Sequence, residues 1–241
     1  MRILVTNDDG IYSPGICLLA EAAAKFGEVR IVAPAVEQSS MAHAVTASRP
    51  LTHRRTRIAH FDAFRVDGTP ADCVGLGMFV WGHVDVVFSG INLGLNVGNA
   101  MWHSGTLAAA KQASLLGARG IAFSAPDFGD DDSLRALRPH VEDVIARLIQ
   151  RPDLELVNVN FPARPRGVRY TKQSVRHYAG QIEKAHDPQG RDIFWFVPRP
   201  VERPDPDTDR CAIEDDFISI TPLRLDLTDH RELESLRANA K

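Results

Sequence analysis

The chain has 241 residues, of which 44% are hydrophobic and 24% charged, and these proportions exclude a disordered, collagenous or coiled-coil protein. A chain of this length buries roughly 70–75% of its unfolded surface, so it needs no disulfide framework or structural metal to fold. Its 28 Lys and Arg against 31 Asp and Glu give a net charge of -3, which provides no global positive field for stable binding of nucleic acid or of an anionic membrane.

Cysteine usage and the start of the chain indicate the compartment. Cys17, Cys73 and Cys211 are far apart and form no CxxC pair, which disfavours a disulfide scaffold and a thiolate zinc site. The apolar residues 1–5 reach polar residues too early for a signal peptide, and no apolar run approaches the roughly 18 residues of a membrane span. We therefore expect a soluble, cytoplasmic protein.

Short runs rich in Val and Ile alternate with helical patterns over the first two thirds of the chain. One helix start is clear, because Thr69 can cap it, Pro70 suits its first position and Asp72 is an acid in its first turn. Strands buried on both faces and joined by helices indicate an α/β fold, a doubly wound and mostly parallel sheet that binds ligands at the carboxyl ends of its strands. The expected strands are 3–5, 29–33, 85–89, 121–124 and 157–161, and the expected helices are 14–26, 70–76, 104–116 and 133–150, the last capped by Ser133.

The pattern changes after residue 162, where polar and Pro-rich segments replace the buried strands. We interpret the chain as one domain with a core of residues 1–165 and strand 217–223, extended by residues 166–215 and a terminal helix at 229–241. Because an exposed hairpin has unpaired strand edges, this extension is expected to serve subunit assembly. Its expected elements are an antiparallel pair of 167–175 with 192–197, a Pro- and Asp-rich stretch at 199–210, a strand at 217–220 and a charged helix at 229–240.

The first strand leads directly into Asn7, Asp8, Asp9 and Gly10, where the glycine lets the chain turn sharply. These four residues are also ordinary turn formers, so a solvated turn is the alternative to a site. Their place at the ligand-binding edge of the sheet favours a site, because a divalent cation would offset the repulsion between Asp8 and Asp9. Hard oxygen ligands of this kind suit Mg²⁺, Mn²⁺ or Ca²⁺ rather than zinc.

Two further loops leave the same edge of the sheet. Residues 36–40 form a polar loop after the second strand, and because Ser is common in loops this segment alone indicates no site. Residues 90–98 have a glycine at every fourth position, with Asn92 and Asn96 between them, so this loop can approach a ligand closely. It lacks the GxGxxG spacing of a dinucleotide site, and the chain contains no GxxxxGK[ST] phosphate loop.

The helix at 104–116 begins with Ser104, Gly105 and Thr106, which directly follow His103. Free backbone N–H groups at a helix start, with two hydroxyls and the positive end of the helix dipole, form a site suited to phosphate. An ordinary Ser N-cap is the alternative for this tetrapeptide alone. Its position after the glycine and asparagine loop favours the phosphate site.

Other patterns give weaker signals. The histidines form no HExxH motif or other close metal-ligand spacing, and the absence of a GxSxG elbow disfavours a serine hydrolase. Arg54, Arg55 and Arg57 form a basic cluster that could contact nucleic acid, but polar neighbours favour a solvated hairpin.

Taken in order, these motifs resemble the SurE family of metal-dependent nucleotide phosphatases along nearly the whole chain. The family's Ser-Gly-Thr is found at Ser104–Thr106, and its carboxyl-terminal signature begins here with Phe217 in place of the more usual Tyr. The loop at 36–41 is the weakest match, because many relatives have Arg before the serine. The other matching segments are 2–10, 68–73, 89–92 and 217–228.

The resemblance implies a Rossmann-like core, exchange of carboxyl-terminal elements between subunits, and a homodimer or homotetramer. It also implies one divalent metal ion per subunit, with a phosphate bound at the start of the helix. Ser40 is the alternative to Ser39 in the metal site. The implied metal ligands are Asp8, Asp9, Ser39 and Asn92, and the implied phosphate contacts are Asn96, Ser104, Gly105 and Thr106.

On this basis we expect a cytoplasmic phosphomonoesterase that hydrolyses nucleoside 5'- and 3'-monophosphates with Mg²⁺, Mn²⁺ or Ca²⁺. Attack by water, with Asp8 or Asp9 taking its proton, is favoured over direct attack by an aspartate, because aspartate nucleophiles generally have their two acids separated by one residue. The alternatives are hydrolysis of polyphosphate or another phosphoester, which would need a basic channel such as residues 54–57, and a nucleotide-binding protein without turnover.

Overall fold

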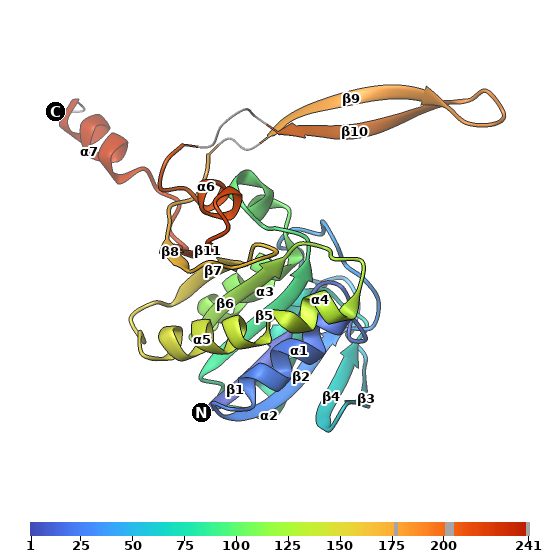
Figure 1. Ribbon diagram of the computed structural model, residues 1–241, viewed down its shortest axis with the longest axis vertical. Coiled ribbons are helices and arrows are strands. Elements are labelled where there is room, and N and C mark those ends of the chain that lie inside the picture. Colours follow the sequence, from blue (N-terminus) through green and yellow to red (C-terminus); the bar gives the residue numbers. More distant parts are fainter. Residues whose placement is uncertain (176–177, 201–204, 240–241) are drawn as a thin grey trace.

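A computed structural model describes residues 1–175, 178–200 and 205–239 of the chain. A nine-stranded sheet runs through the body in the order β3-β4-β2-β1-β5-β6-β7-β11-β8 (Figure 1). Pairing is parallel from β4 to β7, and β3 and β11 run antiparallel to β4 and β7. Its strands are β1 (Arg2–Thr6), β2 (Glu28–Pro34), β3 (His53–Ile58), β4 (Phe61–Val66), β5 (Val86–Leu93), β6 (Arg119–Ala125), β7 (Leu156–Asn160), β8 (Val168–Tyr170) and β11 (Ile218–Pro222).

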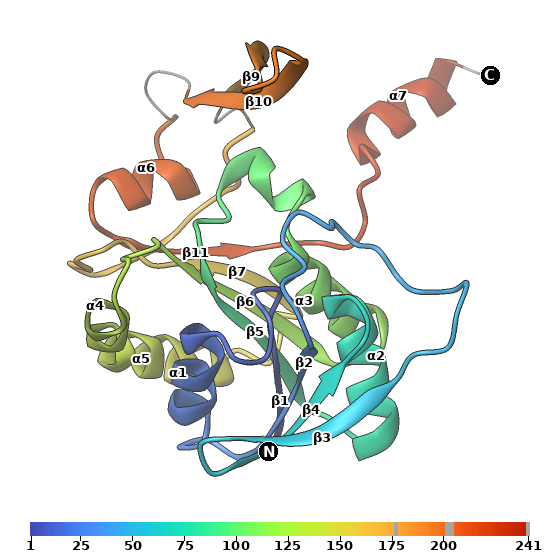
Figure 2. The ribbon, with the colours of Figure 1, turned by 90° about the vertical axis from the view of Figure 1, so that its right-hand side faces the viewer.

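Helices cover both faces of this sheet (Figure 2). On one face α1 (Pro14–Ala23) packs against α4 (Asp131–Ala136) and α5 (Arg138–Ile149), and on the other α2 (Pro70–Trp81) packs against α3 (Gly105–Leu115). Along β1, Ile3 and Val5 enter the core under α1 and Leu4 enters the core under α2. The expected α/β fold with a doubly wound, mostly parallel sheet is thus confirmed. The remaining helices are η1 (Gly98–Trp102), α6 (Asp209–Glu214) and α7 (His230–Asn239).

The strand order reverses its direction between β1 and β5. From β1 the chain proceeds through β2 to β4 on one side, and β5, β6 and β7 follow on the other side. Thr6, the last residue of β1, lies opposite Ser89 of β5. A reversal of this kind opens a crevice at the carboxyl ends of the two strands, where α/β proteins bind ligands. The segments after Thr6 and Ser89 therefore meet in that crevice.

Two helix predictions need correction. The segment expected as one helix at 133–150 forms α4 and α5, because Pro139 lies in the first turn of α5, where its missing N–H costs least. Asp130 rather than Ser133 caps α4, since its carboxylate accepts a hydrogen bond from the Ser133 backbone. The helix after Thr69 begins as expected, with a full capping box, but it continues beyond residue 76 to Trp81.

The strand pairing expected for the extension is wrong in one partner. Residues 192–197 lie in β10 (Asp192–Pro200), which pairs with β9 (Tyr178–His186) in a two-stranded hairpin that projects from the body (Figure 1). Within 167–175, β8 joins the main sheet beside β11 instead. The turn between β9 and β10 is closed by the Asp187 carboxylate, which accepts from the backbone of Gln189 and Arg191. These hydrogen bonds stabilise a tight turn directly before β10, which favours its pairing with β9 over pairing with residues 167–175.

The other carboxyl-terminal predictions are confirmed where the structure describes them. The strand expected at 217–220 is β11, and the helix expected at 229–240 is α7, with residue 240 outside the described residues. Residues 201–204 of the Pro- and Asp-rich stretch also lie outside them. Within the described ranges, every helix is too short or too polar to traverse a lipid bilayer.

Candidate active site

The turn after β1 places the Asp8 carboxylate against the start of α3. Asp8 is only 3% exposed, and its Oδ1 accepts a hydrogen bond of 2.6 Å from the Thr106 hydroxyl. Burial raises the pKa of Asp8 above its ordinary value, although the Thr106 hydroxyl and backbone groups of Gly105 and Thr106 act to lower it. A buried acid is therefore held directly at the positive end of a helix.

Asp9 is the more exposed acid and lies in a negative environment. Its Oδ2 accepts from the backbone N–H of Leu93 at 3.3 Å, which connects the end of β1 to the end of β5. Burial, with a further contribution from the charges of Asp8, Glu37 and Asp127, raises the pKa of Asp9 to about 6. All three charges are negative, so a cation between the two acids would relieve the repulsion.

The loop after β2 lies directly beside these acids. The backbone N–H of Gln38 donates to the backbone oxygen of Asp8 at 2.7 Å, which brings the following Ser39 to the edge of the site. Ser39 is exposed, and its hydroxyl donates to Glu37 at 2.7 Å. Ser40, the alternative ligand, has a left-handed backbone with a φ of 61°. The structure thus brings the segment that contains both serines against the backbone of Asp8 at Gln38.

Two asparagines of the loop at 90–98 lie in the same crevice. Asn92 is near the end of β5, and its amide donates to the backbone oxygen of Gly94 at 2.5 Å. Asn96 is buried, and its amide donates to Ser124 at 2.9 Å and to the Thr106 hydroxyl at 3.3 Å. A continuous chain of hydrogen bonds therefore runs from Asn96 through Thr106 to Asp8.

The start of α3 combines a cap with close packing. The Ser104 hydroxyl accepts from the backbone of Leu107 at 3.1 Å, so it caps the helix as the sequence allowed. A Cβ atom on Gly105 would lie 2.8 Å from the Asp8 Cβ, so no side chain fits there. Thr106 is fully buried, and its hydroxyl donates to Asp8. In this structure the Thr106 hydroxyl thus interacts with the acid itself, and the backbone groups of Gly105 and Thr106 also face Asp8.

Two residues of β7 that sequence reasoning missed hold the Asn96 peptide in place. Asn160 accepts from the Asn96 backbone N–H at 2.8 Å, and Asn158 donates to its backbone oxygen at 2.8 Å. Both asparagines are fully buried. The sequence pattern of β7 could have indicated these residues, because Asn158 and Asn160 alternate with Val157 and Val159 in a strand that is buried along its whole length.

A third missed residue, Asp209, connects the extension to the site loop. Its buried carboxylate accepts from the backbone N–H of Gly98 at 2.7 Å and of Ser174 at 3.0 Å. Gln173 donates to the backbone oxygen of Gly98 at 3.1 Å. The extension therefore also stabilises the loop that carries Asn96.

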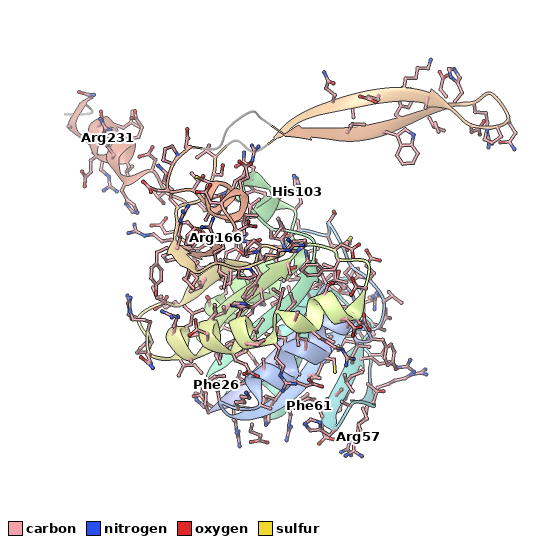
Figure 3. The ribbon with its side chains drawn as sticks, in the orientation of Figure 1. Phe26, Arg57, Phe61, His103, Arg166 and Arg231 are labelled. Atoms are coloured by element: carbon pink, nitrogen blue, oxygen red, sulfur yellow. The ribbon has the colours of Figure 1, made fainter. Side chains whose placement is uncertain are left out.

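The basic cluster is remote from this crevice. Strand β3 runs antiparallel to β4, so Arg57 lies opposite Asp62 at the amino-terminal end of β4. Figure 3 shows Arg57 and His103 at opposite ends of the body. The solvated hairpin is confirmed, since Arg54, Arg55 and Arg57 are exposed. Arg57 also lines a cavity together with Ile11, Tyr12 and Ser13. Among the described residues, no group of three or more His, Cys, Asp or Glu side chains is arranged to hold a metal ion.

Comparison with known proteins agrees with the order of the motifs. The family described as "Survival protein SurE" matches residues 3–180. The chain belongs to the SurE family. It is 45% identical to "5'-nucleotidase SurE 1" of Thermus thermophilus over 98% of this chain and 96% of that protein, and 44% identical to "5'-nucleotidase SurE" of Deinococcus radiodurans over 94% and 88%. The crystal structure of the SurE protein from Aquifex aeolicus superposes with a TM-score of 0.85, at 32% identity and with full coverage of both chains.

Proposed function

We propose that this chain is a divalent-metal-dependent 5'-nucleotidase, which hydrolyses nucleoside monophosphates to nucleoside and phosphate. The observation that carries the proposal is the contact between Asp8 and Thr106, because it joins a pair of acids to the start of α3. A cation site next to an anion site is the arrangement that phosphoryl transfer needs. The names of the Thermus and Deinococcus relatives, each a 5'-nucleotidase, support the same activity.

The residues in the crevice fit a divalent metal ion. Asp8 and Asp9 supply anionic oxygens, and Ser39 and Asn92 supply neutral ones, a donor set that suits Mg²⁺, Mn²⁺ or Ca²⁺. Burial and neighbouring acids raise the pKa of Asp9, which means that its negative charge is destabilised in the metal-free protein. A bound cation would stabilise that charge. We propose one such ion per subunit, with Asp8, Asp9, Ser39 and Asn92 as its protein ligands. When bound, the ion supplies Lewis-acid polarisation of a phosphoryl oxygen.

The remaining chemistry is assigned to the protein's own groups. We propose that the phosphate binds at the start of α3, beside Asn96, Ser104, Gly105 and Thr106, where the positive end of the helix would stabilise the negative charge that spreads over the non-bridging oxygens in the transition state. Asn96 orients the Thr106 hydroxyl through its 3.3 Å hydrogen bond. Asp9 takes the proton of the attacking water at Oδ1, because its Oδ2 already accepts from Leu93. Asp8, almost fully buried, anchors the site to α3.

Release of inorganic phosphate from nucleotides tests the proposal. We expect turnover of AMP, GMP, CMP and UMP with Mg²⁺ or Mn²⁺, loss of turnover with EDTA, and recovery when metal is restored. No dedicated base-recognition motif occurs in the sequence, so rates should differ by much less than the roughly thousandfold that 4 kcal/mol of base-specific binding would produce. The same panel with 3'-AMP compares the two positional isomers. Equal rates with and without metal would contradict the proposal, and one base exceeding the others a thousandfold would reveal a base pocket.

We further propose that the chain assembles into a homodimer or homotetramer in the cytoplasm. The core of residues 1–165 with strand 217–223 would form the catalytic domain, and residues 166–215 with helix 229–241 would form the contacts between subunits. Ile182 of β9 and Trp195 of β10 are more than 60% exposed, and α7 contains no buried residue in the single chain. The three cysteines are free thiols, which suits a reducing compartment.

Assembly can be tested by light scattering. We expect the intact chain to have at least twice the mass of a monomer at micromolar concentration. Replacing both Ile182 and Trp195 with Ser should shift the equilibrium towards smaller species, because it removes apolar surface that only another subunit can cover. Gln181→Ser on the same hairpin serves as the control, because Gln181 is exposed and its replacement removes no apolar surface, so the mass should stay unchanged. A stable, fully active monomer of the intact chain would contradict this part of the proposal.

A further inference from the structure

The segment between β2 and β3, residues 35–52, crosses the carboxyl edge of the sheet and then passes outside α2 (Figure 2). We call it the strap. It contacts the site at two points, since the Gln38 backbone donates to Asp8 at 2.7 Å and the Ala42 backbone donates to the His103 oxygen at 3.0 Å. Ser39, a proposed metal ligand, lies between these two contacts. The position of Ser39 therefore depends on what keeps the strap in place.

Between these contacts the strap adopts backbone conformations that its residues do not favour on their own. Ser40 and Ala42 have left-handed φ angles of 61° and 50°, a conformation that residues with a Cβ atom rarely adopt. Such conformations persist only where surrounding contacts determine them. Contacts along the rest of the strap add to its placement, and the first of them is the 2.8 Å hydrogen bond between His43 Nε2 and Gln112 Oε1 of α3.

Asp72, at the start of α2, anchors the strap further along its length. Thr46 of the strap donates to Asp72 twice, from its backbone N–H to Oδ1 at 2.9 Å and from its hydroxyl to Oδ2 at 2.6 Å. The Thr69 hydroxyl adds a third bond by donating to the Ala44 oxygen at 2.8 Å. Gly68 makes room for this contact, since a Cβ atom there would lie 2.9 Å from Asp72 Oδ2 and 2.8 Å from the Leu51 side chain.

Helix capping alone does not account for these contacts. The capping box uses the backbone of Thr69, which donates to Asp72 Oδ2, and the Thr69 hydroxyl, which accepts from the Asp72 backbone. Both bonds to Thr46 are additional to it, and one of them uses Oδ1, the oxygen that the box leaves free. Burial acts to raise the pKa of Asp72, but the hydrogen bonds from Thr46 and Thr69 outweigh it and the pKa lies below its ordinary value. The charged carboxylate is therefore the form that binds the strap.

We propose that Asp72 is a positioning residue for the phosphatase: by binding Thr46 it holds the strap across the start of α3 and keeps Ser39 beside Asp8 and Asp9. The proposal rests on the proposed function. It gives the segment at 68–73, which forms the start of α2 and takes no part in the site itself, a role in metal and substrate affinity. Asp72 touches neither the metal ligands nor the phosphate contacts, so its effect is transmitted through the strap.

Thr46→Val is the sharpest variant, because it removes the hydroxyl bond to Asp72 and leaves the capping box of α2 intact. We expect amide hydrogen exchange of residues 38–46 to become faster, and the Mn²⁺ dissociation constant, measured by calorimetry, and the KM for AMP to rise about tenfold, the usual effect of losing an outer-shell partner. The kcat at saturating metal and AMP should change much less. Asp72→Asn should show the same pattern more strongly, together with a lower melting temperature from the weakened cap.

Thr56→Val on β3 is the matched control, since the Thr56 hydroxyl contacts only Tyr12 among the described hydrogen bonds, at 3.4 Å, and should change none of these readouts. Unchanged strap exchange in Thr46→Val would overturn the proposal, and so would faster exchange with unchanged Mn²⁺ affinity and KM. If the wild-type chain releases no phosphate from any nucleotide, the proposed function fails. In that case the amide hydrogen exchange of the strap and the Mn²⁺ affinity of Thr46→Val still test whether Asp72 positions the strap.

Discussion

The single variants Asp8→Asn and Asp9→Asn should each lose most of the metal-dependent release of phosphate. Each change removes one negative charge from the proposed metal site and leaves an amide of nearly the same shape. Polarisation of the phosphoryl group by a metal ion is worth several kcal/mol, so we expect turnover of AMP to fall by roughly a thousandfold in either variant. Initial rates at saturating AMP over a range of Mn²⁺ concentrations measure the effect.

The same variants should gain stability in the absence of metal, which separates a functional residue from a structural one. The pKa of Asp9 in the folded protein is about 6, raised from its usual 3.8 by burial and by Asp8. The folded state therefore binds more protons than the unfolded chain between these two values, and stability falls as the pH rises through that window. Asn cannot titrate, so Asp9→Asn should melt higher than wild type at neutral pH in EDTA, by about 3 °C for ~1 kcal/mol.

Calorimetry in EDTA at about pH 4 and about pH 7 checks the sign. The advantage of Asp9→Asn over wild type should be present at the higher pH and absent at the lower. Asp62→Asn is the matched control, because this exposed acid on β4 pairs with Arg55 at 2.8 Å and lies far from the crevice. It should leave turnover unchanged. Near-wild-type turnover of both Asp8→Asn and Asp9→Asn at saturating metal would reject the proposed site.

The parts of the site that could be predicted are those that directly follow a buried strand or begin a helix. Asp8 and Asp9 follow the apolar run of β1, and Asn92 lies near the end of β5, after its apolar run at 86–88. Parallel strands bring such segments to one edge, so their meeting followed from the predicted fold. The start of α3 could also be predicted, because Ser104 and the alanine-rich run after it define a helix start. The roles given to these residues stay predictions that the variants test.

The partners that hold these segments could not be predicted, because they are distant in sequence. Asn160 binds the Asn96 backbone across 64 residues, and Asp209 binds Gly98 across 111 residues. Hydrophobic periodicity and turn-forming residues give information only about residues close together in the sequence. The alternation of asparagine and valine in β7 showed that polar groups would be buried, but nothing in that pattern identifies their partner. Asp72 was readable as a helix-capping residue and not as a partner of Thr46.

The misassigned hairpin has a different cause. Residues 167–175 and 178–186 both contain β-forming residues, and 192–197 could pair with either segment. Asp187 decides the pairing by closing the turn through its carboxylate, with Gly190 at a φ of 80°. The strand β8, freed from the hairpin, pairs with β11 through main-chain hydrogen bonds, a long-range choice that depends on the space left at the edge of the sheet.

Thr106→Val should impair catalysis far more than folding. The Thr106 hydroxyl donates to Asp8 and accepts from Asn96, so its loss removes the bond that counteracts the raised pKa of Asp8 and also releases Asn96. Asp8 is a proposed metal ligand, so we expect turnover of AMP to fall by roughly a hundredfold or more, about the size of effect that the loss of one preorganised hydrogen-bond donor has in other active sites. The pKa of Asp8 should rise further without this donor, so the acid limb of the pH–rate profile should move to higher pH.

Melting temperatures distinguish this role from helix capping. Thr106→Val should melt within a few degrees of wild type, because valine has nearly the same shape. Ser104→Ala should lose about 1 kcal/mol of stability with the cap as well as activity, since Ser104 caps α3 and also lies at the proposed phosphate site. Thr171→Val is the control, because Thr171 is a buried threonine bonded to Ser219 and Thr221 away from the crevice. It should likewise melt within a few degrees of wild type and should leave turnover unchanged. Normal turnover of AMP in both Thr106→Val and Ser104→Ala, with lower melting temperatures only, would make the motif a helix cap and place the phosphate elsewhere.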